Sequence, residues 1–239
     1  MAAASWPRLN PGQIHLWRAC LDIDDQQRRR FALFLSDRER DRASRLRSEN
    51  HRNQYIAGRG IARELISRYI GQNPSLIEFK LGPHGKPSLA KPAKGKDICF
   101  NYTDSGNIAL YAFAQDCELG IDIESLAREI HYERIAARKF TDRESAALLE
   151  LPEPQGRHAF LACWTRKEAY GKAKGFGICY PLNSIDLCVD YRAPTMTIRD
   201  DAACNGNRYW TLQQFYPNEE FVAAIVYAGG PRQLLYFNY

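Results

Sequence analysis

Two short segments of this 239-residue chain carry side chains that could do phosphate chemistry together. In residues 120–124 (Gly-Ile-Asp-Ile-Glu), Asp122 and Glu124 are two positions apart, so a strand would project both carboxylates from one face. Residues 164–172 (Trp-Thr-Arg-Lys-Glu-Ala-Tyr-Gly-Lys) are typical of a helix with Glu168 and Lys172 one turn apart. Carboxylates beside a lysine can hold Mg²⁺ and a phosphate chain together. Either segment alone is more typical of a solvated strand edge or helix surface, so the interpretation depends on finding both.

Together and in this order, the two segments resemble the 4′-phosphopantetheinyl transferases of the surfactin (Sfp) type, in the W-x-x-K-E-A subgroup. The marks of that family are G-[IV]-D-x-E and W-x-x-K-E-[AS]-x-x-K, and the resemblance covers nearly the whole chain. It implies a holo-[acyl-carrier-protein] synthase that transfers the 4′-phosphopantetheine arm of coenzyme A to a serine of an apo acyl or peptidyl carrier protein. Adenosine 3′,5′-bisphosphate would be released. The carrier would belong to fatty acid, polyketide or nonribosomal peptide synthesis.

The resemblance also implies roles for individual residues. Asp122, Glu124 and Glu168 match the Mg²⁺ ligands, and Glu168 also matches the favoured general base. Lys172 matches the lysine that reaches the pyrophosphate. For Lys167 the sequence leaves a structural role and a phosphate contact equally open. Among residues expected to contact coenzyme A, Lys86 matches the lysine of a G-K-P motif, and the basic residues that could face the 3′-phosphate are Arg42, Arg59 and Arg52.

One segment departs from the family pattern. The family usually has F-N-x-S-H-S-G, whose Ser-His pair contacts nucleotide phosphates, whereas residues 100–106 are Phe-Asn-Tyr-Thr-Asp-Ser-Gly. Thr103 can replace the serine hydroxyl, but the carboxylate of Asp104 would repel a phosphate. The exchange could cost about 2–4 kcal/mol of coenzyme A binding, unless a neighbouring arginine compensates.

Asp104 therefore supports an alternative function, a catalytically weak or inactive module that binds coenzyme A or a carrier protein. A third hypothesis, an RNA-binding protein, is favoured by charge alone. From Arg28 to Arg68 there are twelve arginines against five acidic residues. This surplus is typical of a solvated helical face, or of a surface for an acidic carrier protein or a phosphorylated cofactor. The chain has no base-stacking motif, so we do not expect nucleic acid as a partner.

Composition excludes several other classes of protein. The chain is 45% apolar, yet no apolar run reaches the roughly 18–20 residues that span a bilayer. Its start lacks the basic and apolar regions of a signal peptide. The seven cysteines are scattered and form no C-x-x-C, which argues against a disulfide framework or a zinc site. We expect a cytoplasmic protein in a reducing compartment, without membrane contact.

The pattern of elements predicts an α+β fold that is internally duplicated. Capping boxes begin at Ser36 and at Thr141, each with a glutamate three residues later. Arg63 follows Ser36 by 27 residues, and Glu168 follows Thr141 by the same distance, so the counterparts of the acidic site should be basic. This spacing predicts two similar α+β halves, 1–116 on the nucleotide and carrier-protein side and 117–239 with the metal site. The resemblance implies the same pseudo-twofold arrangement, with the halves packed face to face in a monomer.

Alternating and apolar runs predict strands at 14–21, 77–81, 98–102, 108–114, 119–123, 185–189, 195–198, 210–215 and 221–227. Strand 119–123 is expected to pair beside strand 108–114, and residues 103–107 are expected to form a turn. Helices are expected at 28–35, from Ser36 onward, and at 50–69. Residues 233–239 should either dock or fray.

Overall fold

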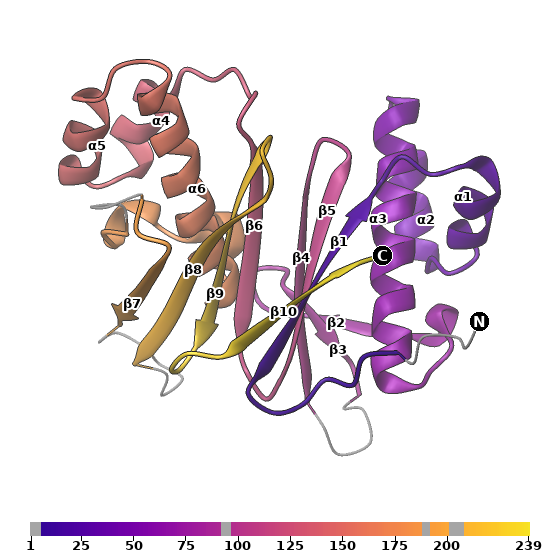
Figure 1. Ribbon diagram of the computed structural model, residues 1–239. Coiled ribbons are helices and arrows are strands. Elements are labelled where there is room, and N and C mark those ends of the chain that lie inside the picture. The colour runs from indigo at the N-terminus through magenta and orange to yellow at the C-terminus, as the bar shows by residue number, and fades with distance from the viewer. Residues whose placement is uncertain (1–5, 92–96, 188–191, 201–207) are drawn as a thin grey trace. The chain divides into compact units, whose positions relative to one another are not determined.

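The computed structural model describes residues 6–91, 97–187, 192–200 and 208–239. The chain divides into two compact units. The first comprises Met1–Lys80, Ser88–Asp116 and Gln233–Tyr239, and the second comprises Leu81–Pro87 and Cys117–Arg232. A short two-stranded sheet is formed by β2 (Phe79–Leu81) and β3 (Pro87–Leu89). The mixed α+β class expected from the sequence is confirmed (Figure 1).

The first unit is a four-stranded sheet in the order β10-β1-β5-β4, packed against helices (Figure 1). Its elements are β1 (Gln13–Cys20), α1 (Asp25–Ala32), α2 (Asp37–Ser44), α3 (Glu49–Ile70), a 3₁₀ turn η1 (Pro74–Leu76), β4 (Ile98–Ser105), β5 (Ile108–Gln115) and β10 (Gln233–Asn238). Strand β10 docks parallel to β1, which decides between docking and fraying for the last residues.

The core of the first unit lies between α3 and the sheet. Buried residues of α3 such as Ile61 and Leu65 share one cluster with Trp17 of β1 and Phe113 of β5. At Gly60 a Cβ would lie 2.3 Å from the Phe31 Cβ, so α1 can pack there only because Gly60 has no side chain.

The second unit is an antiparallel sheet in the order β6-β9-β8-β7, with α6 packed on β6 and β9. Its elements are β6 (Leu119–Ser125), α4 (Tyr132–Lys139), α5 (Asp142–Leu149), α6 (Gln155–Ala173), two 3₁₀ turns η2 (Gly177–Cys179) and η3 (Leu182–Ser184), β7 (Thr195–Arg199), β8 (Tyr209–Asn218) and β9 (Phe221–Ala228). Strand β9 is apolar and buried along its whole length.

Several sequence predictions about strands were wrong. Strand β6 pairs with β9 rather than with β5, because both edges of β5 are already taken by β1 and β4. Thr103 and Asp104 lie within β4, opposite Leu110 and Ala109, and the turn consists of Gly106–Asn107 alone. A strand was predicted at 185–189, but residues 185–187 form none, and residues 188–189 lie outside the described residues. Helix α4 was not predicted.

Both predicted capping boxes are confirmed, and each glutamate binds a cation of the long helix in its own unit. Glu39 binds Arg63 of α3, and Glu144 binds Lys167 of α6. These contacts match Arg63 with Lys167, and therefore Glu64 with Glu168. This is one residue away from the match given by equal spacing, which paired Arg63 with Glu168. The expectation of a basic counterpart for Glu168 was therefore wrong, since the contacts place an acid there.

Candidate active site

The two motif segments lie on elements of the second unit that pack directly against each other, β6 and α6. Gly120 allows this close approach, because a Cβ there would lie 2.3 Å from both the Ala169 oxygen and the Ala173 nitrogen of α6. Real Cβ atoms essentially never come within 3.0 Å of another heavy atom, so any side chain would push strand and helix apart. The motif glycine thus sets the distance between the two acids of β6 and Glu168 of α6.

The two acids of β6 are each paired with a cation. The Lys172 Nζ lies 2.6 Å from Oδ1 of Asp122 and also donates to the Ile121 carbonyl at 3.2 Å. The Arg128 Nη1 lies 2.5 Å from Oε1 of Glu124. Burial raises the pKa of Glu124. The Arg128 guanidinium opposes that rise, and the negative charge of Asp122 adds to it.

Glu168 is the acid of α6, and it differs from the other two in having no cation in contact. It is 7% exposed, and in the described part of the chain its carboxylate makes no hydrogen bond or ion pair. Burial raises the pKa of Glu168, the charge of Asp122 raises it further, Lys172 opposes the rise, and Glu124 adds to it. The charges of Asp122 and Glu124 therefore both reach the Glu168 carboxylate.

The donor set suits a hard divalent cation, because carboxylate oxygens are the ligands that Mg²⁺ prefers. A cation there would relieve the repulsion that raises the pKa of Glu168. Across the described residues, however, no three His, Cys, Asp or Glu side chains are grouped as a ready-made metal site. Lys172 and Arg128 occupy two of the carboxylates instead. The chemistry of the residues fits a metal, and the arrangement is not a closed coordination shell.

Two other lysines singled out from the sequence have their ammonium groups held by the protein. The Lys86 Nζ lies 2.8 Å from Glu118 Oε2 and donates to the carbonyls of Leu119 at 2.9 Å and Ala173 at 3.1 Å. This pins the 82–87 loop to the start of β6 and the C-terminal end of α6, where a cation also meets the negative end of the helix dipole. Lys167 is fully buried, and its ammonium has three acceptors within the protein. Of the two roles that the sequence left open, these contacts fit the structural role rather than a phosphate contact.

The remaining candidates lie in the first unit. Arg59 binds Glu39, with 2.7 Å between Nε and Oε1, and its guanidinium lies 5.2 Å from the ring centre of Tyr102. Arg42 is exposed and lies 5.6 Å from the ring centre of Tyr55. On β4, Thr103 is buried and Asp104 is exposed.

Asp104 and Arg59 act on the same buried group, the Tyr111 hydroxyl. Burial raises the pKa of Tyr111 well above its ordinary value, the charge of Asp104 adds to this rise, and the charge of Arg59 lowers it. The opposite charges of Asp104 and Arg59 therefore both reach this hydroxyl.

Sequence reasoning missed Arg128 and Glu118. Arg128 follows Glu124 by four residues, a spacing that indicates contact only in a helix, and this segment is a strand end followed by a turn. Glu118 borders the acidic motif but binds Lys86, which lies 32 residues earlier in the chain. No local pattern reports a pair so distant in sequence.

Comparison with known proteins identifies the family. Residues 118–226, which contain every candidate of the second unit except Lys86, match the 4′-phosphopantetheinyl transferase superfamily. The 4′-phosphopantetheinyl transferase HetI of Nostoc sp. is 34% identical over 95% of this chain and 92% of its own length. The chain belongs to the 4′-phosphopantetheinyl transferase superfamily.

Further members of the superfamily share shorter stretches. The transferase Sfp of Bacillus subtilis is 29% identical over 69% of this chain and 71% of its own length. The transferase AcpT of Salmonella typhimurium is 32% identical over 56% of this chain and 65% of its own length. The protein is thus an enzyme of the phosphopantetheinyl transferase class, and assignment to the Sfp-type subgroup within it has weaker support. Among its described helices, none is both long and apolar enough to cross a membrane.

Proposed function

We propose that this enzyme transfers the 4′-phosphopantetheine arm of coenzyme A to a serine of an apo acyl or peptidyl carrier protein, with Mg²⁺, and releases adenosine 3′,5′-bisphosphate. The observation that carries the proposal is the Glu168 carboxylate, which is buried beside Asp122 and Glu124 with no cation in contact. Buried acids with raised pKa values beside a lysine are expected at a site built for a cation and a phosphate chain. The superfamily membership supplies the reaction class.

Asp122, Glu124 and Glu168 would hold the Mg²⁺, which when bound neutralises charge on the pyrophosphate and orients it. In the reaction the serine Oγ bonds to the phosphorus next to the pantetheine arm, and the bond from that phosphorus to the bridging oxygen breaks. Glu168 accepts the serine proton directly or through a water molecule. The Lys172 ammonium stabilises the negative charge on the leaving oxygen.

The other candidates for contacting coenzyme A come from the first unit and from the 82–87 loop. Arg42 and Arg59 are candidates for its 3′-phosphate, since Arg42 is exposed and Arg59 is only partly buried. Thr103 and Lys86 are further candidates, although the ammonium of Lys86 is already held by the protein. We assign to Arg59 the compensation for Asp104, because both charges act on the Tyr111 hydroxyl.

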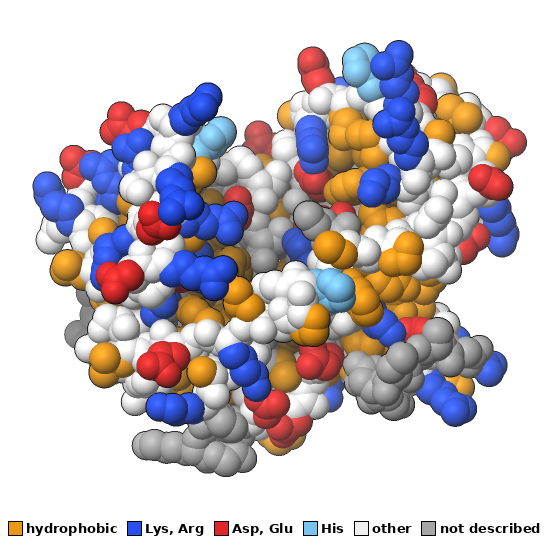
Figure 2. Space-filling view, turned by 180° about the vertical axis from the view of Figure 1, so that it is seen from behind, with side chains coloured by type: hydrophobic (Ala, Val, Ile, Leu, Met, Phe, Trp, Pro, Cys, Tyr) orange, Lys and Arg blue, Asp and Glu red, His pale blue; other side chains and the backbone are white. Residues whose placement is uncertain are grey.

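The carrier protein should be acidic. Lys and Arg side chains gather over the part of the first unit formed by α1, α2 and α3 (Figure 2). Four exposed arginines in or between these helices form no ion pair within the described residues, namely Arg29, Arg38, Arg42 and Arg47. We therefore propose that this surface attracts an acidic partner rather than nucleic acid, and that the enzyme works as a cytoplasmic monomer.

The test is the mass of an apo carrier protein after incubation with the enzyme, coenzyme A and Mg²⁺. We expect a gain equal to the phosphopantetheine arm, lost on adding EDTA and in Glu168→Gln, which keeps the shape of the side chain but removes its charge. Coenzyme A binding without any mass gain on several carriers would support the binding module instead. Absence of both would overturn the proposed function while leaving the family assignment intact.

A further inference from the structure

Lys167 directly precedes Glu168. Its ammonium links α6 to Glu144 and to the carbonyls of Leu182 and Ile185, and we call this set of contacts a bracket. Its Nζ donates to the carbonyls of Leu182 at 2.7 Å and Ile185 at 2.6 Å, and lies 2.7 Å from Oε2 of Glu144. An ammonium has three N–H groups, so these acceptors use all of its donors. The two side chains of the ion pair are 0% exposed.

Glu144 extends this bracket to two more segments. Its Oε2 accepts from the Thr141 backbone N–H at 2.9 Å, which starts α5, and its Oε1 accepts from the Leu187 N–H at 2.8 Å. Burial alone would raise the pKa of Glu144, but Lys167 and these backbone donors outweigh burial and lower it. The pair therefore joins the start of α5 and residues 182–187 to the middle of α6.

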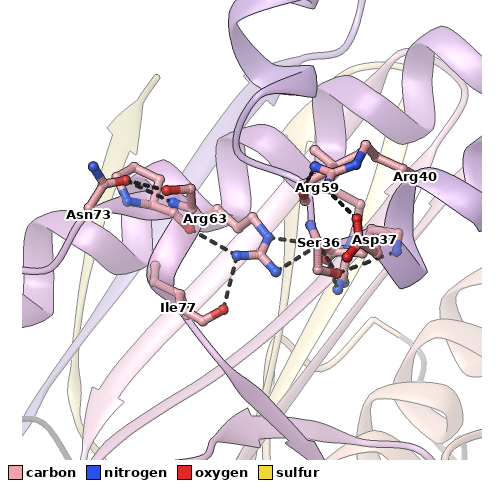
Figure 3. Close-up of polar contacts among 11 residues, drawn as sticks. Ser36, Asp37, Arg40, Arg59, Arg63, Asn73 and Ile77 are labelled. Atoms are coloured by element: carbon pink, nitrogen blue, oxygen red, sulfur yellow. Dashed lines mark hydrogen bonds and ion pairs between the residues drawn. The ribbon is translucent and has the colours of Figure 1, made fainter.

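The first unit contains the same bracket built with an arginine (Figure 3). Arg63 binds Glu39, with 2.8 Å between Nε and Oε2, and its Nη1 donates to the carbonyls of Pro74 at 2.9 Å and Ile77 at 3.0 Å. Pro74 begins η1 and Ile77 is its C-cap, as Leu182 and Ile185 begin and cap η3. In both units, a capping-box glutamate, a cation of the long helix and the two ends of a 3₁₀ turn make the same contacts.

This comparison separates the two roles that the sequence left open for Lys167. Arg63 makes the bracket in a unit without the acidic motif, so the bracket does not depend on a phosphate ligand. We propose that Lys167 is a positioning residue that fixes the rotation of α6 and thereby the direction of Glu168, and that it does not contact coenzyme A. The inference rests on the proposed function of Glu168.

The neighbouring residue strengthens this role. Arg166 is also fully buried, and it donates to Gln214 Oε1 at 2.8 Å, to the Leu187 carbonyl at 3.2 Å and to the Ala193 carbonyl at 2.8 Å. Successive helical residues point about 100° apart, since a turn takes 3.6 residues. Two anchors at that angle hold α6 against rotation, and Glu168 is the next residue along.

The decisive test compares Lys167→Met, Glu144→Gln and the double variant in steady-state transfer and in coenzyme A titration calorimetry. We expect kcat to fall about 10- to 100-fold in each single variant, because Glu168 is misdirected. The coenzyme A Kd should stay within about twofold of the parent value, since no phosphate contact is lost. The kcat of the double variant should be no lower than the lower of the two single-variant kcat values, because the two side chains act as one unit. Lys172→Met is the matched comparison and should weaken coenzyme A binding.

A Kd at least about tenfold weaker in Lys167→Met but not in Glu144→Gln would overturn the proposal, because it would reveal a phosphate contact. If Lys167→Met does not fold, the parent enzyme can be acetylated with acetic anhydride instead, and the modified lysines identified by mass spectrometry. Lys167 should resist modification with and without coenzyme A, and reaction that coenzyme A blocks would contradict the burial argument. If the parent enzyme does not bind coenzyme A, the proposed function is refuted. The acetylation of Lys167 without coenzyme A would still test whether its side chain is buried.

Discussion

Gly120→Ala is the smallest change that should disable the candidate site. The added Cβ would lie 2.3 Å from the Ala169 oxygen and the Ala173 nitrogen, whereas ordinary contact begins at 3.4 Å. The difference, 3.4 minus 2.3, means that β6 and α6 must separate by about 1 Å. Both obstructing atoms belong to the main chain of a helix, so no side-chain rotation can relieve the clash.

The separation should affect both stability and catalysis. Overpacking of this kind costs about 1–3 kcal/mol of the free energy of unfolding. A displacement of about 1 Å between Glu168 and the acids of β6 should lower kcat about 100-fold. The measurements are urea unfolding followed by tryptophan fluorescence and transfer of the phosphopantetheine arm to an apo carrier protein, at a temperature where the variant is folded.

Two glycines of α3 provide matched controls. At Gly58 a Cβ would meet its nearest neighbours at 3.8 and 3.9 Å, so Gly58→Ala should leave activity unchanged and stabilise the helix by about 0.5–1 kcal/mol. Gly60→Ala clashes with Phe31 in the first unit, and it should lose stability while the second unit keeps its geometry. A Gly120→Ala enzyme that is destabilised but has the parent kcat would refute the claim that this glycine positions the acids.

Three further outcomes follow from the contacts. Burial lowers the pKa of His15 to about 4 from 6.5, so between these values the unfolded chain binds a proton that the folded chain does not. Stability should therefore fall by up to about 3 kcal/mol as pH drops through this window, and urea unfolding of His15→Gln should show a flatter pH dependence. Arg63→Met removes one of the two arginines that bind the buried Glu39 carboxylate and leaves Arg59 as the other, so it should cost about 1–3 kcal/mol in the same assay. Asp104→His should leave the coenzyme A Kd within about twofold of the parent value in calorimetry, because Arg59 compensates for Asp104, and a Kd at least about tenfold tighter would overturn that assignment.

Local features of this fold could be predicted from the sequence because their causes lie within a few residues. The capping boxes at Ser36 and Thr141 depend on a hydroxyl and a glutamate three residues apart, and both form. Strands β1, β5 and β9 follow apolar or alternating runs. The partner of a strand cannot be predicted from a few neighbouring residues, because it depends on which strand edges the rest of the chain occupies. That is why the partner of β6 was predicted wrongly.

The candidate site also combines features that the sequence could predict with features that it could not. The motif spacing predicted that Asp122 and Glu124 project from one face of a strand, and the resemblance added Glu168 to them. In the structure the charges of both β6 acids raise the pKa of Glu168. The resemblance matched Lys86 to a lysine near the nucleotide and Lys172 to one at the pyrophosphate, and it left the role of Lys167 open. One side-chain type can bind a phosphate, a carboxylate or a backbone carbonyl, so the sequence does not show which of these each lysine contacts. Only the three-dimensional contacts assign Lys86 and Lys167 to backbone carbonyls distant in sequence, and Lys172 to Asp122.

The direction of the pKa shift separates three glutamates that bind cations within the fold from Glu168, the proposed catalytic one. Glu39, Glu64, Glu144 and Glu168 are buried to a similar extent, between 2% and 7% exposed. Burial raises the pKa of each, but in the first three, arginine or lysine partners and hydrogen bonds outweigh burial and lower it. For Glu168 nothing outweighs burial, and two neighbouring acids add to the rise.

Linkage gives these opposite shifts opposite effects on stability. The three paired glutamates stabilise the fold above their ordinary pKa and lose that contribution as pH falls through the lowered pKa. Glu168 destabilises the fold as pH rises from its ordinary pKa through the raised one, and it keeps that cost at neutral pH. Such an unrelieved cost is expected where a group is placed for binding or catalysis rather than for folding. Glu168→Gln should therefore stabilise the metal-free enzyme at pH 7 while abolishing transfer, and a loss of stability would show that Glu168 supports the fold.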